Sequence, residues 1–427
     1  MADVRDPRPK SAVSGAVGLA GLCGLGLWFA LARWFGMDGP YSALAGLACS
    51  ALPMLIWSIA VDKVHRSPST GIDWNQPARP LSETIDLSLT KLAGLWTTWG
   101  GIAIVYMVAR WYWTGGYAFA MQVLGAVAPF LILISAPYVI WLDRRLREPR
   151  DGAWALGMWL IGQGGDKAAI AEHLRQWAVK GFFLAFMLSI VPGGFADAVR
   201  APWAEIIASP VALSRFLITL MFMIDVQIAT VGYMLTLKPL DAHIRSAEPT
   251  MAGWVAALIC YPPFVLMANG GPLDYHPATA DWALWLEGWP VAQAALGAVL
   301  VALTAVYAWA TVAFGIRFSN LTHRGILTHG PYRFTKHPAY LSKNIFWWLS
   351  TLPFLTTSGS LTDAARNCAL MAAVAGVYWW RARTEEAHLS ADPAYRAYAG
   401  WMERNAPIPR MLRRLRGGGR AAVQPAE

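Results

Sequence analysis

The chain has 427 residues, of which 56% are hydrophobic and 14% charged, and 23 residues are tryptophan. This composition excludes an ordinary soluble domain and a disordered chain, because most of these side chains need surroundings in which ionisable groups are costly. The formal charge of +9 does not indicate nucleic acid binding, since the basic residues gather in loops on one side and in a C-terminal tail. The sequence predicts an all-α integral membrane protein.

Apolar runs that approach the length of a membrane span recur along the whole chain. A spanning helix needs about 20 mainly apolar residues. Ten candidate spans follow from this criterion, and the last two are short enough to form a tight hairpin. They are Ser14–Phe35, Tyr41–Val61, Leu92–Ala109, Phe119–Leu142, Gly181–Val199, Phe216–Leu237, Met251–Met267, Val291–Phe314, Leu341–Leu355 and Asn367–Trp380. We expect Pro192 and the Pro262-Pro263 pair to be positions where two spans can break.

Lysine and arginine are concentrated in every second loop, which places most of them on one side of these spans. They accumulate in cytoplasmic loops of membrane proteins, and residues 37–40, 269–289 and 356–363 contain none. The loops on the other side are basic, and so is the tail with Arg410, Arg413, Arg414, Arg416 and Arg420, which we expect to meet an anionic lipid surface. About ten transmembrane helices with both termini in the cytoplasm are therefore predicted. No cleavable signal is expected, because Ser14–Phe35 continues as a full span.

Two features of the first seven spans leave alternatives open. Residues 166–180 space apolar side chains on one face, which is typical of a helix in the membrane interface or of an ordinary surface helix. Asp225 lies in an apolar run, so its carboxylate must face the bundle interior. It is either a structural hydrogen-bond acceptor or part of a cavity for a substrate.

The loop from Arg324 to Tyr340 reads R-G-I-L-T-H-G-P-Y-R-F-T-K-H-P-A-Y and is dense in polar groups and glycine. Pro338 favours an extended His337 and the start of a helix near Ala339, whose free amides would favour a carboxylate or phosphate. After the hairpin comes R-A-R-T-E-E, in which Glu385 and Glu386 suit a cationic or amino-bearing ligand. We expect a small charged cofactor between these two segments. His323 and His329 are expected to be ordinary loop residues, and the four cysteines lack the spacing of a metal site or a disulfide framework.

These segments resemble a known family. The run G-P-Y-R-F-T-K-H-P-A-Y-L, a two-helix hairpin, R-x-R-T-E-E-x-x-L and the Tyr395, Tyr398 pair are similar to the isoprenylcysteine carboxyl methyltransferase family, which is related to the phospholipid methyltransferases. The resemblance covers roughly residues 291 to 410. It implies a division into an N-terminal bundle of about seven spans of unknown role, residues 1–285, and a methyltransferase-like membrane domain, residues 286–427.

The resemblance implies an S-adenosylmethionine pocket at the cytoplasmic face and an acceptor taken from the bilayer. Glu385 or Glu386 would bind the cofactor, and Arg383 would hold the carboxylate of a lipophilic or amphipathic methyl acceptor. The other residues implied at the cofactor are Ile326 and Leu327 along the adenosyl group and Tyr332, His337, Pro338, Ala339 and Tyr340 around it.

The chain departs from the family pattern just after this block. The glycine common there is replaced by Ser342, followed by Lys343 and Asn344. Lys343 either extends its ammonium to the interface or belongs to an acceptor site. The change puts a prenylcysteine acceptor in doubt more than it does the cofactor.

Other interpretations of the site stay open at the level of sequence. His337 before a proline is also a simple helix cap, and Glu385 and Glu386 are also a solvated face paired with Arg381 and Arg383. The main alternative function is a sterol-reductase-like NADPH-dependent oxidoreductase, although the continuation after H-P-A-Y fits that group less well. The third is a non-enzymatic membrane protein with a relict site.

Overall fold

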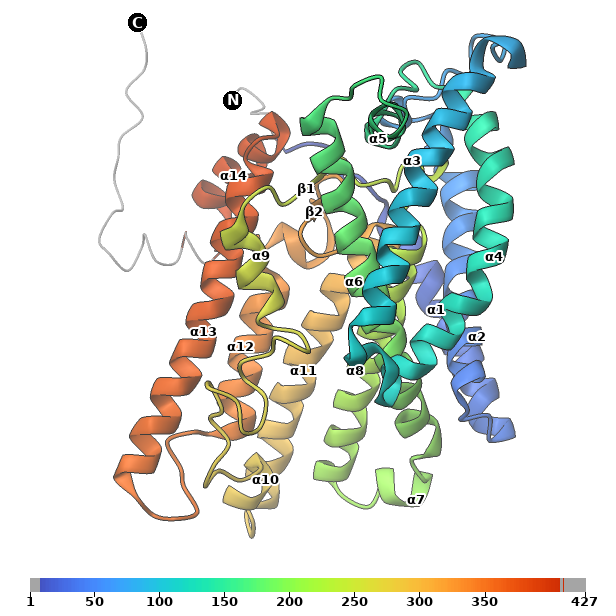
Figure 1. The fold of residues 1–427 in the computed structure, drawn as a ribbon. Coiled ribbons are helices and arrows are strands. Elements are labelled where there is room, and N and C mark those ends of the chain that lie inside the picture. The colour runs from blue at the N-terminus through green and yellow to red at the C-terminus, as the bar shows by residue number, and fades with distance from the viewer. Residues whose placement is uncertain (1–7, 408–409, 411–427) are drawn as a thin grey trace, which may run out of the picture.

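The computed structural model describes residues 8–407 and 410, which form a bundle of helices with one two-stranded sheet (Figure 1). Arg413, Arg414, Arg416 and Arg420 of the basic tail lie outside the described residues. The long helices are α1 (Gly15–Phe35), α2 (Pro40–Ile56), α3 (Leu81–Val108), α4 (Gly115–Asp143), α6 (Lys167–Arg200), α8 (Pro210–Met234), α11 (Pro290–Phe314) and α13 (Leu361–Leu389). The shorter elements are α5 (Gly152–Leu160), α7 (Trp203–Ile206), α9 (Met251–Leu258), α10 (Trp282–Trp285), α12 (Pro338–Thr351), α14 (Pro393–Asn405), β1 (Ser246–Ala247) and β2 (Thr322–His323).

Among the described residues, six helices are long and apolar enough to cross a membrane: α1, α2 with its π-helical extension to Val61, α4, α6, α8 and α11. The chain is therefore a multi-pass membrane protein. Helices α3 and α13 have the length of a span but more polar sequences, and α12 has 14 residues, which at about 1.5 Å per residue fall short of a hydrocarbon core of about 30 Å. The full count of ten spans and the side on which the termini lie stay predictions.

The two proline-bearing breaks behave differently. The span predicted over Met251–Met267 is wrong, because α9 ends at Leu258 and the chain continues through turns that contain Pro262 and Pro263. Two consecutive prolines donate no backbone hydrogen bond, so a helix cannot continue there. By contrast, α6 runs unbroken through Pro192. Residues 167–180 are part of that same helix rather than a separate one, and Asp166 is its N-cap.

Helices from the N-terminal and C-terminal parts of the chain pack into one bundle. Figure 1 shows α12 and α13 on one side, α3 and α4 on the other, and α6 and α8 between them. The largest core cluster joins residues from α1, α2, α6 and α8 to Val312 of α11 and Leu327 of the loop that follows. Helix α1 approaches α11 so closely that a Cβ at Gly18 would lie 2.0 Å from the carbonyl oxygen of Val312. The predicted N-terminal bundle and C-terminal region thus share one core, and the division at residue 285 stays a prediction.

Arg324 connects the ends of two central helices. Its side chain is 3% exposed and donates hydrogen bonds to the carbonyl oxygens of Gly232 in the last turn of α8 (2.9 Å) and of Ile316 just after α11 (2.9 Å). Further bonds reach Phe318 O (2.8 Å) and Ala242 O (2.7 Å). The last carbonyls of a helix have no partner within it, so one guanidinium satisfies both ends and fixes the loop between α11 and α12. Burial, together with the nearby charge of Arg317, lowers the pKa of Arg324 to about 9.

Replacing Arg324 by methionine keeps the volume but removes these hydrogen bonds. Each buried carbonyl left without a donor costs about 1–3 kcal/mol, so we expect the melting temperature of the detergent-purified variant to fall by at least about 5 °C. Arg333→Met, in the same loop but exposed, is the matched control and should change it by no more than about 2 °C. Equal melting curves for the two variants would show that Arg324 does not hold the helix ends together.

Candidate functional site

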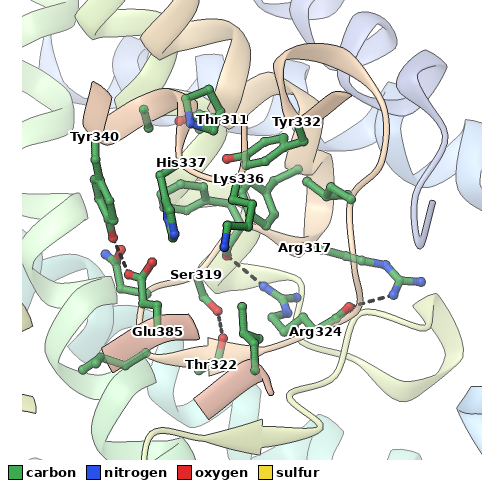
Figure 2. A pocket seen from close by; sticks show the side chains of 18 of the residues that line it. Thr311, Arg317, Ser319, Thr322, Arg324, Tyr332, Lys336, His337, Tyr340 and Glu385 are labelled. Atoms are coloured by element: carbon green, nitrogen blue, oxygen red, sulfur yellow. Dashed lines mark hydrogen bonds between the residues drawn. The ribbon is translucent and has the colours of Figure 1, made fainter. Parts of the chain in front are cut away.

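A cavity of about 180 Å³ lies between the loop after α11, the start of α12, the end of α13 and two tyrosines of α14. Figure 2 shows the side chains of Lys336 and His337 between Tyr340 on one side and Tyr332 on the other. Tyr340 and Glu385 meet at one edge, and Arg324 lies across from them. The two segments that the sequence singles out therefore line one cavity and meet at one of its edges.

The apolar wall of the cavity is positioned from several parts of the chain. Ile326 and Leu327 both line it. The N-terminal segment is hydrogen-bonded to them, since Ala12 N donates to Ile326 O (2.9 Å). Strand β2, just before them, pairs antiparallel with β1. Tyr332 packs edge-on against Phe314, with ring centroids 5.2 Å apart. The Tyr398 hydroxyl fixes the backbone of this turn by donating to Tyr332 O (2.8 Å).

His337, Lys336 and Glu386 form a charged cluster at one edge of the cavity. Glu386 Oε1 lies 3.0 Å from His337 Nε2 and 2.7 Å from Lys336 Nζ. Burial raises the pKa of Glu386, but the hydrogen bonds and charges of His337 and Lys336 outweigh this and lower the pKa to about 2. Glu386 is therefore ionised at neutral pH and orients His337, whose ring stacks on Tyr340 with centroids 5.7 Å apart.

Glu385 lies next to Glu386 near the end of α13, but its side chain belongs to a second hydrogen-bond network. Its Oε1 accepts a hydrogen bond from the Tyr340 hydroxyl and lies 3.4 Å from Arg381 Nε. Arg381 in turn donates to Asn320 Oδ1 (2.6 Å) and to the Tyr261 hydroxyl (3.3 Å). Glu385, Tyr340 and Arg381 all line the cavity.

The predicted site residues divide into those that line the cavity and those that do not. Eight of them line it: Ile326, Leu327, Tyr332, His337, Pro338, Ala339, Tyr340 and Glu385. Glu386 lies behind His337 and Lys336. Arg383 does not line the cavity: its side chain is 63% exposed and lies 3.2 Å from Glu386 Oε2.

Arg381 was missed as a site residue, although the sequence carries a signal for it. Residues four apart share a face of a helix, whereas residues two apart do not. Arg381 lies four residues before Glu385 in α13, so both face the cavity while Arg383 turns away. Asn320 and Tyr261 have no such signal, since they come from distant segments.

The cavity continues toward the membrane-spanning part of the bundle. Tyr307 and Thr311 of α11 and Lys343 of α12 line this part. Lys343 Nζ lies 5.2 Å, 5.0 Å and 5.7 Å from the ring centroids of Tyr307, Trp347 and Tyr378. Behind them, Asp225 of α8 is buried and accepts a hydrogen bond from the Thr311 hydroxyl. Asp225 therefore faces the bundle interior, as expected, and its partners come from another helix.

The donor set suits an organic ligand with a positive group. The cavity offers the Glu385 carboxylate, several aromatic rings and apolar side chains, and among the described residues no group of three histidine, cysteine, aspartate or glutamate side chains is placed to hold a metal ion. Most cations of the wall already have partners: Arg324 is bound to backbone carbonyls and Arg317 lies 2.7 Å from Asp241.

Comparison with known proteins gives one result. No curated protein and no solved structure matches the chain. Residues 292–391, which run from α11 to the end of α13, match the family model described as the isoprenylcysteine carboxyl methyltransferase (ICMT) family. The C-terminal region is thus similar to the family that its motifs predicted, over nearly the predicted residues.

Proposed function

We propose that this protein is an integral-membrane methyltransferase that uses S-adenosylmethionine and takes its acceptor from the bilayer. One observation carries the proposal. Within the region that matches the family, Glu385 from the end of α13 and the His337 to Tyr340 turn from the start of α12 face one cavity.

The residues of the cavity fit this cofactor. A sulfonium and an amino group are cationic, and they suit a carboxylate and the faces of aromatic rings. Glu385, Tyr332 and Tyr340 supply these, and Ile326 and Leu327 supply an apolar surface for an adenine ring. Glu386 would act through His337, which it orients.

Bound S-adenosylmethionine would supply a methyl group whose transfer breaks the sulfur–carbon bond and leaves the electron pair on sulfur. This leaving group needs no acid, so positioning and exclusion of water supply most of the rate acceleration. The chain contributes to both. The hydrogen-bonded Tyr340 and Glu385 fix one wall, and the stacked His337 ring shields it.

Arg381 is better placed than Arg383 to bind the methyl acceptor. The family resemblance assigns an acceptor carboxylate to Arg383, but Arg383 is exposed and Arg381 is 3% exposed and lines the cavity. We propose that Arg381 holds the polar group of the acceptor. Its apolar part would extend toward Tyr307, Lys343 and the membrane-spanning helices.

The reductase alternative fits the cavity less well. A nicotinamide dinucleotide carries phosphates that need unpaired cations. Lys336 is committed to Glu386, and Arg317 and Arg324 to Asp241 and backbone carbonyls. Arg381 and Lys343 are the cations of the wall that remain for the phosphates.

Cofactor binding tests the proposal directly. Calorimetric titration of the detergent-purified protein should show binding of S-adenosylmethionine and S-adenosylhomocysteine but not of NADPH. His337→Ala and Glu385→Gln each remove a contact in the wall, and the affinity should fall at least about tenfold. Arg333→Ala, exposed in the same loop, serves as the control and should bind normally. Binding of NADPH alone would favour the reductase, and binding of none of the three would remove the basis for an enzyme.

Labelled methyl transfer to membrane lipid extracts separates the two arginines. Arg381→Met should lower transfer by about 10- to 100-fold, the loss expected when a charged hydrogen-bond donor is removed. Arg383→Met should leave transfer within about threefold of the unsubstituted protein, because exposed charges contribute little. Retained binding of S-adenosylhomocysteine serves as the folding control for both variants. The opposite ranking would restore the role that the family resemblance gives to Arg383.

A further inference from the structure

A second hollow, far from the candidate site in sequence, lies where α4 ends and the chain before α3 crosses it. Its volume is about 260 Å³. The residues that line it are Asp73, Gln76, Pro77, Arg79, Arg144, Arg145, Leu146 and Arg147. The family match does not reach this part of the chain.

Backbone pairing builds the hollow before any ligand is present. Residues 71–79 run beside residues 144–147, with Asp73 N donating to Arg145 O (2.8 Å), Arg147 N to Gly71 O (3.0 Å) and Arg79 N to Arg144 O (2.9 Å). The Arg79 side chain adds hydrogen bonds to Asp143 O (2.7 Å) and Leu146 O (2.6 Å). Arg144 Nε donates to Arg79 O (2.8 Å), so the side chains of Arg79 and Arg144 are held in place by the main chain.

The charge of this wall is unbalanced. Four guanidinium groups line the hollow against one carboxylate, Asp73, whose Oδ2 lies 3.7 Å from Arg147 Nε. An excess of three positive charges remains, concentrated in a concave space. Guanidinium groups bind phosphate oxygens in pairs of hydrogen bonds, which makes arginine the preferred residue for this group.

The surroundings indicate the membrane as the source of the phosphate. In the most apolar stretch of α4 only 11% of the residues are buried. Residues 130–134 expose large hydrophobic side chains, as expected of a helix that faces lipid. The Arg145 guanidinium lies 5.3 Å from the ring centroid of Trp74, which lies 6.2 Å from that of Trp141. Both tryptophans are partly exposed, and tryptophan concentrates at the level of lipid headgroups.

We propose that this hollow, with Arg144, Arg145 and Arg147 as its ligands, binds the headgroup phosphate of an anionic phospholipid. The arginines hold the phosphate, and Trp74 and Trp141 lie at the boundary between headgroup and acyl chain. The site is independent of the proposed methyl transfer.

Short-chain lipids test the proposal with the full chain in detergent. Dihexanoyl phosphatidylglycerol should bind in calorimetric titrations, and the Arg145→Gln/Arg147→Gln double variant should lose at least about tenfold in affinity. Arg150→Gln is the control, because Arg150 is an exposed arginine of the same connection that does not line the hollow. A melting curve of each variant confirms that it is folded.

Two further probes identify the source of the phosphate. Dihexanoyl phosphatidylcholine has the same chains and a zwitterionic headgroup, and it should bind at least about tenfold more weakly than the anionic lipid. Inorganic phosphate should bind more weakly still. Equal binding of the two lipids, tighter binding of inorganic phosphate, or unchanged binding by the folded double variant would each overturn the proposal.

Discussion

The structure depends on one buried cation, Arg324, which satisfies the carbonyl ends of α8 and the turn after α11 at the same time. Unpaired carbonyls at such depth are costly, and a cation at a helix C-terminus also interacts favourably with the helix dipole. Because the guanidinium is fixed from both helices, the residues that follow it have little freedom. Ile326, Leu327 and Tyr332 are therefore presented to the cavity as one wall. The loop part of the cavity wall is thus fixed to the ends of the two central helices.

Sequence patterns predicted which residues gather around one cavity better than they predicted the helices of the bundle. Eight of the residues proposed at the cofactor line one cavity, because their motif combines turn residues with a helix start, and local rules fix both. Arg381 was within reach of the same reasoning, since helix periodicity pairs it with Glu385. By contrast, hydropathy did not distinguish a continuous helix over Met251–Met267 from an apolar segment of turns. The partners of Asp225 were also beyond prediction, because Thr311 is 86 positions away and only tertiary packing brings it close.

The N-terminal bundle takes part in the candidate site. Tyr261, before the family match begins, accepts a hydrogen bond from Arg381, and Asp225 of α8 receives one from Thr311. The region of residues 292–391 therefore does not complete the cavity wall by itself. The same holds for the hydrophobic core, because α11 shares it with α1 and α8, which lie before the family match. A substitution in the bundle can change the site without touching any residue of the family motif.

The chain departs from the family pattern at Ser342, Lys343 and Asn344, and Lys343 lines the part of the cavity toward the membrane. The ammonium of Lys343 lies among three aromatic rings, and the faces of such rings stabilise a cation. The carboxylate of Asp225, on α8, favours this positive charge. Under the proposed function, the polar group of the acceptor would lie between Lys343 of α12 on the membrane side and Arg381 of α13 on the loop side, so two cations on different helices would set its position.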